Sequence, residues 1–149
     1  MTLTGEPDLH LLVDGVRVGE AARLKGAHIF RVPARPASVR IVSRAGAPVE
    51  LGLVPDPRVL GVAVQRIALR EGKRCRVMDA ADALLAAGFH EYEPDNDLRW
   101  TNGDAALPAA LFDGFDGDLW LAVHVGCTAQ YALGEETEER AAAETRAAA

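Results

Sequence analysis

The chain has 149 residues, the usual size of one domain and enough to bury a hydrophobic core. Its net charge of −6 argues against a dedicated nucleic-acid binder, because phosphate binding needs a concentrated positive field. No apolar run approaches the roughly 18–20 residues of a membrane helix, so we expect no insertion into a bilayer.

The first residues of the chain bear on where the protein resides. They include Glu6 and Asp8 and lack the basic and apolar regions of a secretory signal. We therefore expect a cytoplasmic protein, while non-classical export and excision from a longer chain stay open.

Short apolar runs separated by turn residues predict a mainly β domain over residues 1–133. Leu9, Leu11 and Val13 share one face of a strand, and Asp14-Gly15 is typical of a hairpin turn into the strand at 16–18. Further strands are expected at 28–32, 39–43, 49–54, 60–69, 74–78 and 118–125, with a short edge at 130–133. This spacing is typical of an antiparallel β-sandwich, which we describe as jelly-roll-like.

The longest run, 60–69, changes its alternation midway. Val62 is apolar at an even position, whereas Ile67 is apolar at an odd one. A β-bulge near Gln65 or Arg66 would turn both toward the core. The basic side chains that follow, up to residue 76, flank an expected turn, and we interpret them as the solvated face of a hairpin.

Two segments have helical character. The first, 79–87, has Asp79 as N-cap and Gly88 in the place of a C-cap glycine. The second, 134–149, has an acidic first turn followed by alanines, which suits the helix dipole. It has no apolar stripe beyond alanine, so it is expected to be a helical or disordered tail.

Metal and nucleophile chemistry have little support. Cys75 and Cys127 are too few for a disulfide framework, and we expect them to be free, buried thiols, with a single disulfide between them as the alternative. Neither Ser38 nor Ser43 lies in a GxSxG elbow, and phosphate-binding glycine loops are absent. We therefore expect no enzyme activity. The histidines lack metal-ligand spacing and are expected to be structural; they are His10, His28, His90 and His124.

We expect no cofactor. Calcium is the alternative, because two loops are rich in oxygen ligands. Neither loop has the EF-hand pattern, and aspartate in turns needs no metal to explain it. The side chains concerned are Asp95, Asn96 and Asp97 in one loop and Asp113, Asp116 and Asp118 in the other.

The stretch 88–105 concentrates carboxylates, aromatic rings, an arginine and a histidine, so we expect a ligand site there. Trp100 could stack on a sugar face or pack in the core, and Glu93 and Arg99 could bind hydroxyls or pair with each other. In the second alternative these residues brace the loop. The predicted ligand-binding residues are His90, Glu91, Glu93, Arg99 and Trp100.

Six segments of the chain, taken in sequence order, resemble the pattern of a known family: LHLLVDG (9–15), FRVP (30–33), VRIVSR (39–44), LGVAV (60–64), GFHEYE (88–93) and RWTNGDAALP (99–108). Over residues 8–133 the chain resembles a bacterial accessory domain found beside Hint (hedgehog/intein-type) proteins and glycosyltransferases of surface-polysaccharide pathways. The resemblance implies a β-sandwich that accompanies glycan or surface proteins. The Hint nucleophilic cysteine and terminal asparagine are not matched, so autoprocessing is not implied.

Three functions follow from these observations. The first is a non-catalytic binding module, with carbohydrate or a glycan-related partner as ligand, and an exposed Trp100 would support it. The second is a structural or assembly domain that binds protein through a sheet edge or residues 134–149, with Trp100 buried. The third is an enzyme whose site, for instance around His90 and Glu91, forms only in the fold.

Overall fold

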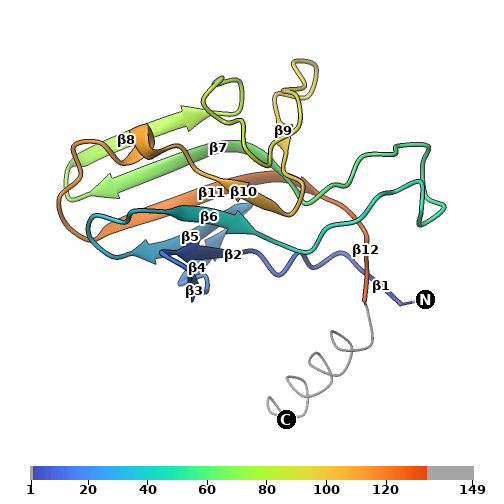
Figure 1. The fold of residues 1–149 in the computed structure, drawn as a ribbon, viewed down its shortest axis with the longest axis horizontal. Helices are drawn as coiled ribbons and strands as arrows, with labels where there is room; N and C mark the ends of the chain where they lie inside the picture. Colours follow the sequence, from blue (N-terminus) through green and yellow to red (C-terminus); the bar gives the residue numbers. More distant parts are fainter. Residues whose placement is uncertain (1, 134–149) are drawn as a thin grey trace, which may run out of the picture.

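The computed structural model describes residues 2–133, and the chain forms an antiparallel β-sandwich (Figure 1). The larger sheet has the order β4 (Ala22–Leu24), β5 (Ala27–Val32), β11 (Leu119–Thr128), β7 (Val62–Glu71) and β8 (Arg74–Asp79), and β9 (Arg99–Trp100) pairs with β7. The smaller sheet has the order β10 (Asp104–Ala106), β6 (Val39–Val42), β2 (His10–Val13) and β3 (Val16–Val18). A third pair joins β1 (Leu3–Thr4) to β12 (Tyr131–Ala132).

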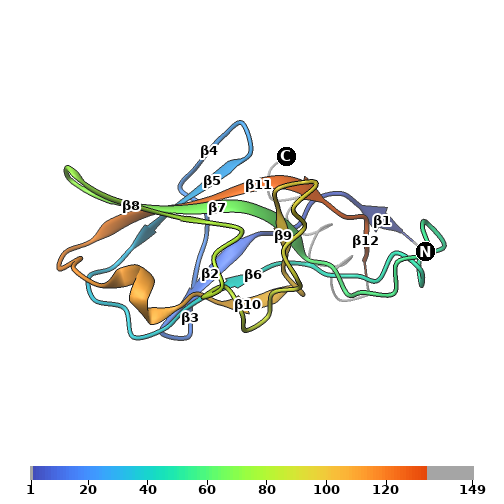
Figure 2. The same ribbon diagram turned by 90° about the horizontal axis from the view of Figure 1, so that it is seen from above.

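The two main sheets form separate layers, which Figure 2 shows from the edge. Alternate residues of each strand point between the layers, because successive side chains of a strand lie on opposite faces. Leu11 and Ile41 from the smaller sheet and Phe30 and Leu121 from the larger one are fully buried. The predicted β-sandwich is therefore confirmed, and the outward faces of both sheets are left for other contacts.

The predicted bulge lies in the middle of β7. Arg66 pairs with His124 and Val64 pairs with Val125, so Gln65 has no partner across the ladder. Val64 and Ile67 are both fully buried, as the bulge was expected to allow. A second irregularity follows on β11, where Gly126 lies between the paired residues Val125 and Cys127.

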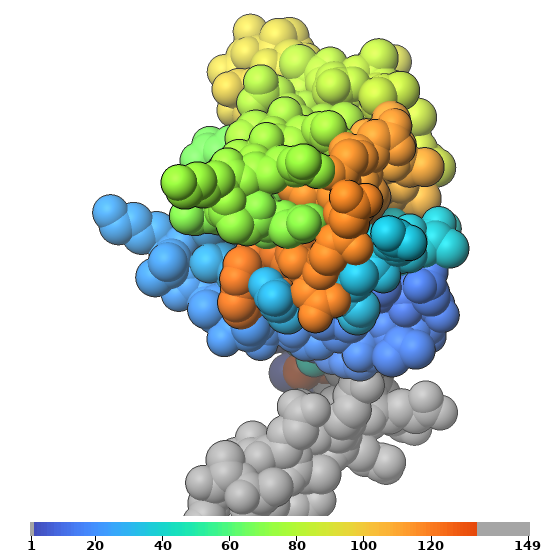
Figure 3. Space-filling model, turned by 90° about the vertical axis from the view of Figure 1, so that its left-hand side faces the viewer, coloured from blue at the N-terminus to red at the C-terminus, as the bar shows by residue number. Residues whose placement is uncertain are grey.

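Two carboxylates bind backbone N–H groups at one end of the sandwich. The Glu71 carboxylate accepts hydrogen bonds of 3.1 Å from the backbone N–H groups of Asp116 and Gly117. Asp118 accepts a bond of 2.8 Å from the N–H of Ala34. Figure 3 shows this end, where the orange segment of the chain lies against the green tip of the β7–β8 hairpin.

The predicted helix at 79–87 is wrong. The segment forms successive turns, and in residues 2–133 the helical element is the 3₁₀ helix η1 (Ala109–Phe112). Ala80 donates its N–H to the Gln65 carbonyl, which continues the sheet, and its own carbonyl accepts a bond from Arg99. These tertiary partners replace the bonds within a helix. The predicted tail helix lies outside the described residues.

The predicted strand at 49–54 is also wrong. The segment turns back on itself, with the N–H of Leu53 bonded to the carbonyl of Pro48 and Gly52 at a φ of +71°. The prediction of buried cysteines fails as well, since Cys75 and Cys127 are free but exposed. Cys75 points outward from β8, and Cys127 follows the irregularity at Gly126. Among the described residues no helix is long and apolar enough to cross a membrane.

Candidate ligand-binding surface

The five residues predicted to bind a ligand lie on a small hairpin beside β7. Phe89 bridges to Thr101 and Glu93 bridges to Leu98, with the turn at 94–97 between them. Gly88 begins this hairpin at a φ of +85°, and a side chain there would collide with the backbone of Asp104 and Ala105. The hairpin is therefore held firmly against the smaller sheet.

Arg99 braces this part of the chain through backbone carbonyls. Its guanidinium donates to the carbonyls of Ala80 at 2.7 Å, Leu85 at 3.1 Å and His90 at 3.3 Å. Its Cζ also lies 6.0 Å from the ring centroid of Tyr92. Arg99 thus ties three points of the chain together, whereas the bracing alternative had paired it with Glu93.

Trp100 is a core residue, because only 8% of its surface is exposed. It packs with Leu60 and Ala63 in a second, smaller hydrophobic cluster, against which Leu98 and Ala129 also lie. A sugar cannot stack on the full face of a ring buried in this way. A buried Trp100 is what we expected if the chain is a structural or assembly domain.

Glu93 pairs with Arg58 and not with Arg99. Their atoms Oε2 and Nη1 are 3.2 Å apart, and Arg58 also binds Asp56 at 2.7 Å. The hydrogen bonds from Arg58 lower the pKa of Asp56 to about 2. His90 Nε2 lies 2.6 Å from the carbonyl of Val59. This network fastens the hairpin to the preceding loop.

A pocket of about 320 Å³ lies between this loop and the end of β11. Trp100 lines part of it, together with Arg58 and the exposed side chains of Leu53 and Val54. Glu91 is exposed on the hairpin. The ligand-binding role of His90, Glu91, Glu93, Arg99 and Trp100 stays a prediction.

The outward face of the larger sheet carries three rows of cross-strand neighbours. The tryptophan row contains Trp120, which is 43% exposed, between Arg31 and Arg70. The alanine row contains Ala22, Ile29, Ala122, Ala68 and Val77. The histidine row contains Leu24, Ala27, His124, Arg66 and Asp79.

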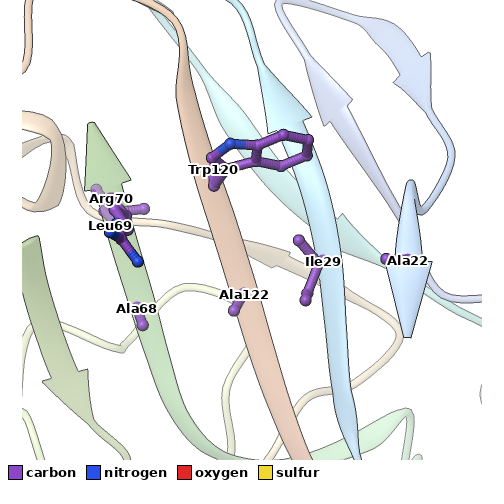
Figure 4. Close-up of a pocket in the computed structure, with 7 residues that line it drawn as sticks. All are labelled: Ala22, Ile29, Ala68, Leu69, Arg70, Trp120 and Ala122. Carbon is purple, nitrogen blue, oxygen red and sulfur yellow. The ribbon is translucent and has the colours of Figure 1, made fainter. Parts of the chain in front are cut away.

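A shallow apolar trough of about 430 Å³ follows the alanine row (Figure 4). Ala22, Ala68 and Ala122 leave space above the sheet because their side chains are single methyl groups. The indole of Trp120 extends from β11 toward β5 at one end of this space. We call this space the Trp120 trough; it is lined by Ala22, Ile29, Ala68, Leu69, Arg70, Trp120 and Ala122.

The arginines of this face differ in their partners from other arginines of the domain. Arg17, Arg23 and Arg40 form ion pairs with carboxylates. Arg31 lies over the Trp120 ring, with its Cζ 4.8 Å from the centroid, and Arg70 donates to the carbonyl of Gly72. Within residues 2–133 neither of these two has a carboxylate within ion-pair distance. The trough is thus flanked by cations available to a ligand.

Within residues 2–133 no group of three or more histidine, cysteine or acidic side chains is placed to hold a metal ion. The two loops considered for calcium have other partners. Asp97 accepts a bond of 2.6 Å from the Tyr92 hydroxyl, and Asn96 donates to Glu93 at 3.0 Å. Asp118 accepts the bond from Ala34 described above.

Comparison of the chain with protein-family models, with curated proteins and with solved structures gave no match.

Sequence reasoning did not select Trp120, although the signal was present. In the strand predicted at 118–125, Leu119 and Leu121 are apolar and lie on one face, so Trp120 between them lies on the opposite face. The neighbours that make the trough come from β4, β5 and β7, whose pairing no single segment specifies.

Proposed function

We propose that the domain is a non-catalytic carbohydrate-binding module whose ligand lies in the Trp120 trough. The observation that carries the proposal is the exposed indole of Trp120 beside a row of alanines on an outward sheet face. Flat apolar faces of sugar rings stack on indole rings, and the alanines leave room for such a ring next to Trp120. The resemblance to domains that accompany glycan proteins favours the same ligand class.

Arg31 and Arg70 supply the polar part of the interaction. They lie directly across the ladders on either side of Trp120 and have exposed side chains. A guanidinium presents several N–H donors in a fixed geometry, which suits the hydroxyl groups at the rim of a stacked sugar. The trough therefore combines an apolar surface with donors at its edge, as small-molecule sites commonly do.

The test is calorimetric titration of the whole chain with a panel of bacterial surface polysaccharide fragments. Saturable binding to one or more fragments is expected, with loss of about 10-fold or more in affinity for Trp120→Ala. Val16→Ala is the matched control, because Val16 is 66% exposed on the other sheet. Binding that Trp120→Ala leaves unchanged would rule out the trough, and absence of binding to every fragment would rule out the function.

Protein binding is the second candidate function. Its supporting observation is the turn after Pro48, where Val49, Leu53 and Val54 are each about half exposed. Exposed apolar side chains gathered in one loop are typical of protein interaction sites. A triple substitution of these residues by serine should then abolish capture of a protein partner while saccharide binding at Trp120 persists.

A further inference from the structure

The paired irregularities of β7 and β11 form a second pocket next to the Trp120 trough. Its volume is about 420 Å³, and its polar lining comes from Lys25, Gln65, Arg66 and His124. We call it the bulge pocket. We propose that it binds the acidic group of an acidic saccharide whose ring stacks on Trp120; the inference rests on the proposed function.

At two glycines, neighbouring parts of the chain approach the backbone around this pocket closely. Gly26 has a φ of +107°, and a Cβ there would lie 2.9 Å from the carbonyl oxygen of Val125. A Cβ at Gly126 would lie 2.8 Å from Nε2 of Gln65, so the Gln65 side chain covers Gly126. The Gln65 amide and the neighbouring cations are thereby brought to one opening in the sheet face.

Charge determines the ligand class. Lys25, Arg66 and His124 have no carboxylate partner within ion-pair distance among residues 2–133, and Asp79, directly across the ladder from Arg66, forms no ion pair with it. Burial and the charge of Arg66 lower the pKa of His124, and an anion in the pocket would favour its protonated, charged form. A second copy of this face would instead bring arginines against arginines, which disfavours self-association.

The pocket and the trough are continuous along β11. The side chains of Trp120, Ala122 and His124 project from the same face of β11. Trp120 and His124 are four residues apart, a separation that spans roughly 13 Å along a strand. A saccharide of more than one ring can therefore reach from the indole to the cations. Such a ligand would bear carboxylate, sulfate or phosphate substituents, which form the strongest hydrogen bonds with guanidinium and ammonium groups.

The test compares acidic oligosaccharides with their neutral counterparts. Oligomers of polygalacturonate, alginate and hyaluronan are titrated into the whole chain, each beside the same oligomer with its carboxyl groups reduced to alcohols. An acid form should bind about 10-fold more tightly than its neutral form, and the difference should shrink as NaCl rises. NMR titration should show that only the acid form raises the pKa of His124.

Two substitutions locate the anion. Lys25→Asn suits the backbone, because asparagine tolerates the φ of +51° found there, and Arg66→Gln keeps most of the side-chain volume. Each should remove most of the preference for the acid form and leave binding of the neutral form unchanged. Arg35→Gln is the matched control, since Arg35 is an exposed arginine at a φ of +50° in a loop away from this face.

The outcomes separate the two proposals. Equal affinity for acid and neutral forms, both lost in Trp120→Ala, would overturn the bulge pocket and leave the carbohydrate-binding function standing. Absence of binding to either form would overturn both. Tighter binding of an oligothymidylate than of every acidic oligosaccharide at the same salt concentration would overturn the saccharide assignment, since stacking bases and phosphates could use the same groups.

Discussion

Arg31 lies over the indole ring of Trp120, with 4.8 Å between the guanidinium carbon and the ring centroid. The two residues face each other across the β5–β11 ladder, so the contact needs no loop to hold it. The guanidinium shields part of a ring that remains 43% exposed. The pair therefore orients the indole at the edge of the Trp120 trough while leaving ring surface for a ligand.

Removing this contact should change the accessibility of Trp120 more than the stability of the domain. For Arg31→Gln we expect a loss of about 1 kcal/mol or less in unfolding free energy, because exposed cation–π contacts contribute little. Acrylamide should quench Trp120 more strongly in this variant than in Arg35→Gln. Unchanged quenching would mean that Arg31 does not cover the ring in solution.

Substitution of Arg99 should lower the unfolding free energy of the domain, and the loss should depend on the shape of the guanidinium as well as on its charge. Arg99→Gln leaves the carbonyls of Ala80, Leu85 and His90 without their shared donor. We expect a loss of about 2–4 kcal/mol in urea unfolding, since several charge-assisted bonds are removed together. Arg99→Lys should recover less than half of this loss, because an ammonium cannot reproduce the planar fork.

The same pair of variants tests the predicted ligand site at residues 88–105. Under conditions where each variant is fully folded, saccharide affinity should equal that of the wild type if Arg99 only braces the loop. A folded Arg99→Lys protein that has lost its saccharide affinity would restore Arg99 as a ligand-binding residue.

Much of the fold followed from alternation and turn residues. Asp14-Gly15 set the first hairpin, and the change of phase between Val64 and Ile67 located the bulge at Gln65. These features depend on neighbouring residues, which a sequence displays directly. The helix prediction at 79–87 failed because two backbone carbonyls of that segment accept hydrogen bonds from Arg99, which lies 19 residues after one and 14 residues after the other.

The candidate surface was harder to predict, for the same physical reason. That Trp120 points outward follows from its own strand, but the alanines beside it come from three other strands. The basic residues after Gln65 were interpreted as a solvated hairpin face. Arg66 and Arg70 do project outward, and only the pairing of β7 with β11 places them beside His124 and Trp120.

Two glycines with similar backbone angles should respond very differently to alanine. Gly15 has a φ of +81° with no atom within 4 Å of an added Cβ, whereas a Cβ at Gly88 would lie 2.6 Å from the Cα of Ala105. Gly15→Ala should therefore cost about 1 kcal/mol, the strain of the left-handed region alone. Gly88→Ala should cost at least about 3 kcal/mol, because the hairpin must also move. Equal midpoints in urea would contradict the close contact at Gly88.

His28 should make the stability of the domain depend on pH near neutrality. Its side chain is buried at the β4–β5 edge, with Nδ1 3.0 Å from the Glu20 carboxylate. Burial, followed by the nearby charge of Arg23, lowers the pKa of His28 below its usual value of 6.5, although Glu20 acts in the opposite direction. The unfolded chain therefore binds a proton at a higher pH than the folded domain does.

The sign of the effect follows from this difference. The contribution of His28 to stability is fully present above about pH 6.5 and falls as the pH drops through the folded pKa, because protons favour the unfolded state. Urea midpoints between pH 7.5 and 5 should decline less steeply for His28→Gln than for the wild type.

His124, whose pKa is also lowered, is present in both proteins and cancels in the comparison. Glu20 has its pKa lowered from 4.5, so its own loss of stability falls below this window. Parallel pH profiles would show that His28 is not desolvated in the folded domain.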